Sequence, residues 1–120
     1  MIKALIISLS VGAAAGLLGA LCGIGGGIVM VPAFSQLLGI EHKQAIATSL
    51  AIIIITALVA TTNNAKAGLI DWRIVLCAAT GAAAASWWGS ELMQSLQSTT
   101  LTRIFGITLL VFGAKMLIKP

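Results

Sequence analysis

The chain has 120 residues, of which 59% are hydrophobic and only 8% are charged. A mean hydropathy of +1.10 leaves too few polar side chains to coat a globule in water, which argues against a secreted, cytosolic or disordered protein. The formal net charge of +4 comes from basic residues scattered singly along the chain, so it indicates membrane topology rather than nucleic-acid binding.

Polar residues divide the chain into four apolar blocks, which we expect to be helical. The first block, residues 4–38, would form a helix about 52 Å long if it were straight, whereas the hydrocarbon core is about 30 Å thick. Four of the five residues from Gly23 to Gly27 are glycines, and Pro32 follows. We therefore predict a broken helix hairpin, with Gly23, Gly25 and Pro32 as the break or hinge and a shorter helix that turns back after it.

The later blocks are predicted to be spanning helices over residues 45–62, 74–92 and 104–118, each close to the length that crosses a bilayer. The expected fold is an all-α membrane protein with four to five transmembrane or re-entrant helices in one domain, residues 1–120. Small residues at spacings of three and four indicate faces where helices pack closely. The predicted packing positions are Gly12, Gly16, Gly19, Gly81 and Gly89.

The distribution of basic residues depends on how often the first block crosses the membrane. If it forms a hairpin or two short crossings, Lys3, Lys43 and Arg103 lie on one side and Lys66, Arg73, Lys115 and Lys119 on the other. Three basic residues against four give no preferred orientation. Such a chain can insert in both orientations and pair antiparallel with itself. If the block crosses only once, the balance is uneven and both termini would lie in the cytoplasm.

A few polar positions beside the blocks have structural interpretations. Asp71 is expected to begin a helix. Asn63 and Asn64 either cap the end of the second block or line an entrance, and we favour capping. His42 lies between two charged residues and is interpreted as a solvated loop residue.

Several segments resemble the sulfite exporter TauE/SafE family of membrane permeases. They are the run from Gly16 to Pro32, Ala-Ile-Ala-Thr-Ser-Leu at 45–50, Gly-Leu-Ile-Asp-Trp at 68–72 and the segment 101–110. The resemblance implies transport of small sulfur-containing anions, such as sulfite or sulfonates, across a bacterial inner membrane. Family members are typically about twice this length and look like two tandem copies of such a unit. This implies a homodimer, or a heterodimer with a second half-length chain.

The glycine break is the candidate substrate site. Main-chain amides at the start of a helix can donate hydrogen bonds to an oxyanion, and Gly25, Gly26 and Gly27 let a ligand approach the main chain closely. Thr48 and Ser49, early in the second block, are expected to add hydroxyl donors. The structural alternatives are close packing or a hinge for the glycines, and hydroxyls bonded to their own helix for Thr48 and Ser49.

Other chemistry has little support in the sequence. It contains no phosphate-binding glycine motif, no Cys/His cluster for a metal and no nucleophile with an evident base. We therefore expect no cofactor, no metal and no enzymatic activity. Two alternatives to a permease remain: a structural or assembly subunit without its own substrate, and a passive anion channel.

Overall fold

Five α-helices make up the computed structural model, which describes residues 1–119. They are α1 (Ile2–Cys22), α2 (Gly27–Leu37), α3 (His42–Lys66), α4 (Trp72–Ser95) and α5 (Ser98–Ile118). Helices α1, α3 and α5 are long and apolar enough to cross a membrane, and α2 is a shorter apolar helix. The predicted all-α membrane fold with a glycine-rich helix break is confirmed, and residues 1–119 contain no strand.

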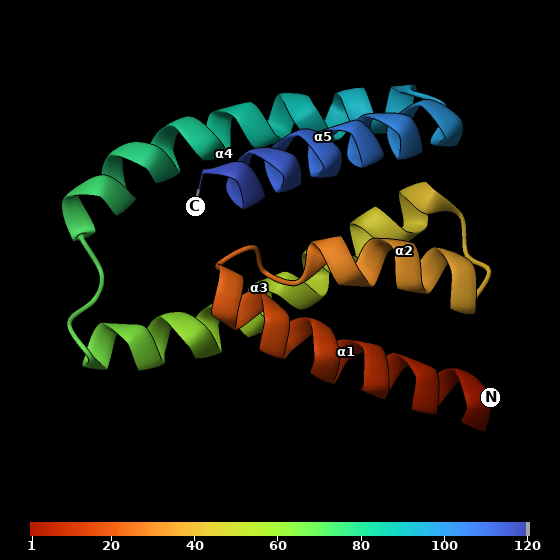
Figure 1. The fold of residues 1–120 in the computed structure, drawn as a ribbon, viewed down its shortest axis with the longest axis horizontal. Coiled ribbons are helices and arrows are strands. Elements are labelled where there is room, and N and C mark those ends of the chain that lie inside the picture. Colours follow the sequence, from red (N-terminus) through yellow and green to blue (C-terminus); the bar gives the residue numbers. More distant parts are fainter. Residues whose placement is uncertain (120) are drawn as a thin grey trace.

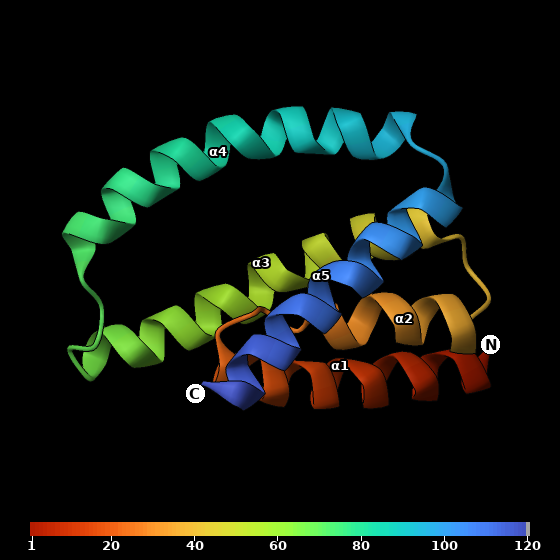
Figure 2. The ribbon, with the colours of Figure 1, turned by 45° about the horizontal axis from the view of Figure 1, so that its top comes forward.

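Successive helices alternate in direction (Figures 1 and 2). Helix α2 turns back along α1 toward the end of the molecule where the chain begins, and α3 then runs in the direction of α1. Helix α4 returns, and α5 again follows the direction of α1, so the two termini lie toward opposite ends of the bundle. This arrangement matches the first of the two alternatives, in which the apolar block at 4–38 forms a hairpin or two short crossings.

The core lies where α2 packs between α1 and the first half of α3. Its buried apolar side chains are Val11 and Ala15 from α1, Met30, Val31 and Phe34 from α2, and Ala45 from α3. Phe105 of α5 packs against this cluster from outside. The remaining large apolar side chains are mostly exposed, as expected for helices whose outer faces contact lipid.

Helix α4 stands apart from this core (Figure 2). It has no buried residue, and it is not among the helices apolar enough to count as candidate spans, although its 24 residues are long enough. Its middle is built largely of alanine, glycine, serine and tryptophan rather than leucine and isoleucine. The spanning role predicted for residues 74–92 therefore stays a prediction.

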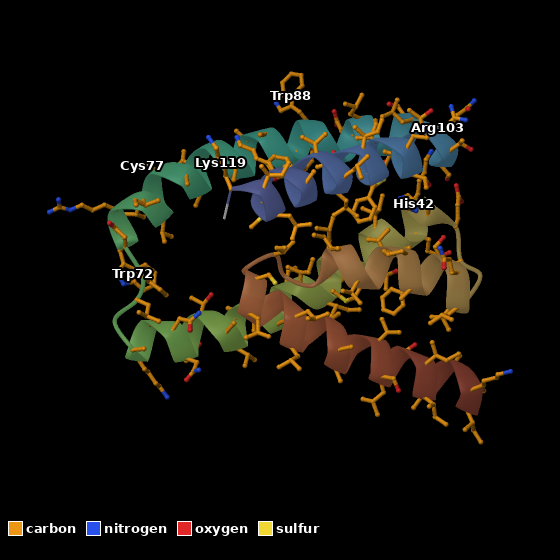
Figure 3. The ribbon with its side chains drawn as sticks, viewed as in Figure 1. His42, Trp72, Cys77, Trp88, Arg103 and Lys119 are labelled. Carbon is orange, nitrogen blue, oxygen red and sulfur yellow. The ribbon has the colours of Figure 1, made fainter. Side chains whose placement is uncertain are left out.

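One end of the bundle joins the start of α3 to the connection between α4 and α5 (Figure 3). Ser98 Oγ donates to Glu41 Oε1 at 2.8 Å, and Lys43 Nζ donates to the Gln94 carbonyl at 2.9 Å. His42 is not a solvated loop residue, contrary to the expectation: it begins α3, is 8% exposed and meets the Phe105 ring edge to face at 6.1 Å. Helix α5 covers it through a contact that local sequence does not reveal.

The opposite end contains the connection from α3 to α4. Asp71 begins α4 as predicted, and its Oδ1 accepts hydrogen bonds from the amides of Arg73 at 3.1 Å and Ile74 at 3.4 Å. Such a cap satisfies amides that have no partner within the first helical turn. Figure 3 shows Trp72 at this end and Trp88 pointing away from the other helices.

Candidate functional site

The break between α1 and α2 is made by glycines in the left-handed region of backbone space. Gly23, Gly25 and Gly26 have φ angles of 72°, 78° and 84°. A side chain strains this conformation, which explains why the break falls at a glycine cluster. Gly23 caps α1 by donating its amide to the Gly19 carbonyl at 2.8 Å, and α2 begins directly after Gly26.

The break folds back against α1 with direct backbone contact. A Cβ added to Gly19 would lie 2.6 Å from Gly26 N, and a Cβ added to Gly26 would lie 2.6 Å from the Ala15 carbonyl oxygen. Neither separation is possible without moving the main chain. Gly19 and Gly26 are therefore required where α1 and the break touch.

The later part of the break also packs against α3. A Cβ on Gly25 would lie 3.1 Å from Ile53 Cγ2, and one on Gly27 would lie 3.4 Å from Ile53 Cδ1. Ile53 stands near the middle of α3, which is about 37 Å long and so exceeds the roughly 30 Å of hydrocarbon. The break therefore lies beside the middle of α3, which is one of the candidate membrane spans.

Several main-chain amides of the break have no main-chain partner. Within residues 1–119, the amides of Ile24, Gly25 and Gly26 donate to no main-chain carbonyl. The Gly26 carbonyl, in contrast, accepts from Val29 and Met30 at 3.1 and 3.0 Å. An unpaired amide costs several kcal/mol in hydrocarbon. The amides of Ile24 and Gly25 therefore need water or a ligand as a partner, whereas Gly26 N is packed against Gly19.

A hollow of about 330 Å³ lies beside the break. It is lined by Gly16, Gly19, Ala20, Gly23, Ile24, Gly25, Ile53, Thr56, Ala57, Ala60, Thr61 and Asn64. Along α3 the lining runs from the middle of the helix to its last turns. No lining residue carries a charge, and the volume is within the range typical of small-ligand sites.

The polar side chains of the hollow come from one face of α3. Thr56, Thr61 and Asn64 lie within a sector of about 140° around α3, because each residue turns a helix by about 100°. Thr56 Oγ1 donates to the Ile53 carbonyl at 3.1 Å, so its proton is already used. Thr61 and Asn64 are thus the side chains that offer free donors to a guest.

The structure brings only part of the predicted site together. Gly25 lines the hollow, whereas Gly26 and Gly27 contact Ala15 and Ile53 directly behind it. Ser49 is 2% exposed and donates to the Ile46 carbonyl at 2.8 Å, and Thr48 is exposed; neither lines the hollow. A binding role for Thr48 and Ser49 stays a prediction, and the lining of the hollow does not support it.

The sequence-based interpretation missed the polar face of α3. Asn64 lines the hollow instead of capping the helix, because α3 continues to Lys66 and ends at Ala67, whose amide donates to main-chain carbonyls. A usable signal was present. Polar side chains in the spanning part of an apolar helix, such as those of Thr56, Thr61 and Asn64, commonly face a cavity or another helix rather than lipid.

The glycines that were predicted to pack against other helices differ in how closely other atoms approach them. Gly19 makes the close backbone contact described above, whereas a Cβ on Gly12, Gly16, Gly81 or Gly89 would meet nothing within 4 Å. Packing at those four positions stays a prediction. Pro32 lies inside α2, which continues through it to Leu37.

Comparison with known proteins identifies the family. The model of the family described as sulfite exporter TauE/SafE matches residues 3–120. The chain belongs to the TauE/SafE family. The predicted recognition is confirmed, and the glycine break and the hollow beside it are therefore features of a TauE/SafE protein.

Two bacterial proteins match this chain over part of their own length. It is 30% identical over 111 residues to the probable membrane transporter protein YunE of Bacillus subtilis (strain 168), covering 92% of this chain and 41% of the relative. It is 39% identical over 82 residues to a probable membrane transporter protein of Haemophilus influenzae (strain ATCC 51907 / DSM 11121 / KW20 / Rd), covering 62% of this chain and 31% of the relative. The chain thus spans less than half the length of either relative. No solved structure matches it.

Proposed function

We propose that this TauE/SafE chain is a subunit of a membrane permease for small sulfur-containing oxyanions such as sulfite or a sulfonate. The permease works in a bacterial inner membrane as a dimer of half-size units. The observation that carries the proposal is the pair of unpaired amides at Ile24 and Gly25, two residues that line a hollow near the middle of α3.

The chemistry of the hollow favours an anion over a cation. The N–H groups of the main chain only donate hydrogen bonds. The start of α2 adds the positive end of a helix dipole. The lining contains no carboxylate to hold a cation. Oxyanions with several acceptor oxygens can engage the amides and the side chains of Thr61 and Asn64 together, and the family and the names of both relatives support transport.

A valine at Thr61 tests the proposed contact, because valine keeps the shape of threonine and removes the hydroxyl. A hydrogen bond to a charged group contributes about 1.5–3 kcal/mol, so we expect Thr61→Val to raise the KM for sulfite about tenfold or more. The measurement is saturable uptake of sulfite into liposomes that contain the purified chain.

Thr62→Val is the matched control. Thr62 Oγ1 donates to the Leu58 carbonyl at 2.7 Å and does not line the hollow, so its KM should stay at the wild-type value. Equal KM values for the two variants would remove Thr61 from the site. A wild-type chain that moves no sulfite or sulfonate would instead favour an assembly subunit, and flux without saturation would favour a channel.

A further inference from the structure

A groove of about 860 Å³ runs along the second half of α3, where this helix extends beyond the end of α1 (Figure 2). Gly16 and Ala20 of α1 line it on one side, and Ile55, Leu58 and Val59 of α3 are the large apolar residues in its lining. The side chains of these α3 residues are exposed, and α3 is long and apolar enough to cross a membrane. An exposed apolar groove on such a helix is suited to contact with hydrocarbon chains.

One end of the groove is positively charged. Lys66, the last residue of α3, is the one charged residue among the described residues that line the groove. Arg73, Lys115 and Lys119 lie toward the same end of the bundle, since α4 begins and α5 ends there (Figures 1 and 3). The carboxylate of Asp71 at this end is already used, because its Oδ1 accepts the amides at the start of α4. This end of the groove therefore attracts anions.

The length of the groove matches the depth of one lipid leaflet. Ile55 and Lys66 are separated by roughly 16 Å along the axis of α3, at about 1.5 Å per residue. The hydrocarbon of one leaflet is half of a core that is about 30 Å thick. A lipid whose headgroup meets Lys66 therefore extends its acyl chain along Val59 to the level of Ile55. The charged end and the apolar length of the groove correspond to the two parts of a lipid.

We infer that this groove binds an anionic phospholipid, with the phosphate at Lys66 and an acyl chain along Val59 and Ile55. Basic side chains at a membrane surface attract anionic lipid headgroups. The amide of Asn63, one turn before Lys66, adds a hydrogen-bond donor for the phosphate. A small free anion would meet Lys66 and leave the apolar length of the groove unused. Lys66 does not line the hollow, so the lipid site does not depend on the proposed transport.

Native mass spectrometry of the purified chain, titrated with phosphatidylglycerol in detergent, tests the lipid site. We expect tighter binding of phosphatidylglycerol than of zwitterionic phosphatidylcholine. Lys66→Gln should weaken phosphatidylglycerol binding about fivefold, because one lysine contributes roughly that factor to the attraction of an anionic lipid. Val59→Trp keeps the charge but places a bulky ring in the groove, so it should also reduce the bound fraction. Val59 is exposed, so this change should not disturb the fold.

Lys3→Gln and Val111→Trp are the matched controls. Lys3 lies at the opposite end of the bundle, and Val111 is exposed on α5 outside the groove. Both variants should bind phosphatidylglycerol with the wild-type Kd, and helical circular dichroism checks that every variant is folded. Equal Kd values for Lys66→Gln and Lys3→Gln, or equal binding of the two lipids by the wild type, would overturn the inference. A dimer that dissociates in Val59→Trp would overturn it too, because a second chain would then occupy the groove.

Discussion

Gly16→Leu is expected to reduce sulfite uptake by at least about tenfold, and to background if the side chain fills the hollow completely. Gly16 lines the hollow, and a Cβ at this position meets nothing within 4 Å, so the added side chain can enter the free volume without moving the backbone. Leucine also has high helix propensity, so α1 should fold normally. The effect is thus expected on transport and not on stability.

Gly12→Leu provides the matched control for Gly16→Leu. Gly12 lies one turn earlier on α1, is half-buried like Gly16 and has no neighbour within 4 Å of an added Cβ, but it does not line the hollow. Its uptake should remain at the wild-type level. Normal uptake by Gly16→Leu, with the protein correctly inserted, would show that the hollow is not on the transport path.

Gly26 is less suitable for this test, although it belongs to the predicted binding residues. Any side chain at Gly26 would place its Cβ 2.6 Å from the Ala15 carbonyl oxygen and would strain a φ of +84°. A loss of transport in such a variant would therefore mix structural damage with loss of a ligand contact. Gly16→Leu separates these effects because its surroundings are open.

The largest effect on stability is expected for Gly19→Ala. The new methyl carbon would lie 2.6 Å from Gly26 N and 2.8 Å from Gly25 C, so the break must move away from α1. Overpacking of this kind costs about 1–3 kcal/mol of unfolding free energy. The midpoint of denaturant-induced unfolding in detergent, followed by helical circular dichroism, should fall accordingly, and sulfite uptake should fall with it.

Gly106→Ala is the control for this loss of stability. Gly106 lies within α5, and an added Cβ there meets nothing within 4 Å. Glycine inside a helix is less favourable than alanine by about 0.5–1 kcal/mol, so this variant should be as stable as the wild type or slightly more stable. If Gly19→Ala unfolds at the same denaturant concentration as Gly106→Ala, then α1 and the break do not touch as described.

Local sequence predicted the helical blocks and the break because both depend on nearby residues. Long apolar runs specify membrane helices, and clustered glycines permit the left-handed backbone at Gly23, Gly25 and Gly26. The role of Gly19 was not separable from those of Gly12 and Gly16 by spacing alone. Gly19 is the glycine of α1 that lies opposite the break once the chain folds back. The packing of α2 against α1 and α3 determines this position.

The identity of the polar side chains that line the hollow depends on the same level of the break, measured along α1 and α3. Thr48 and Ser49 are nearer in sequence to the break, but α2 begins beside Ile53, so the hollow extends along the second half of α3 to Thr61 and Asn64. His42 illustrates a second limit of local reasoning. Its flanking charges suggested exposure, whereas its burial arises from Phe105, which is distant in sequence.

The central claim is that main-chain amides exposed at the helix break hold the transported anion. Amide NMR of the ¹⁵N-labelled chain in lipid nanodiscs, titrated with sulfite, tests this claim most directly. The account predicts saturable shifts of the Ile24 and Gly25 amide signals, whereas signals from the exposed middle of α4 stay unchanged. Saturable binding that leaves these amide signals in place would contradict it.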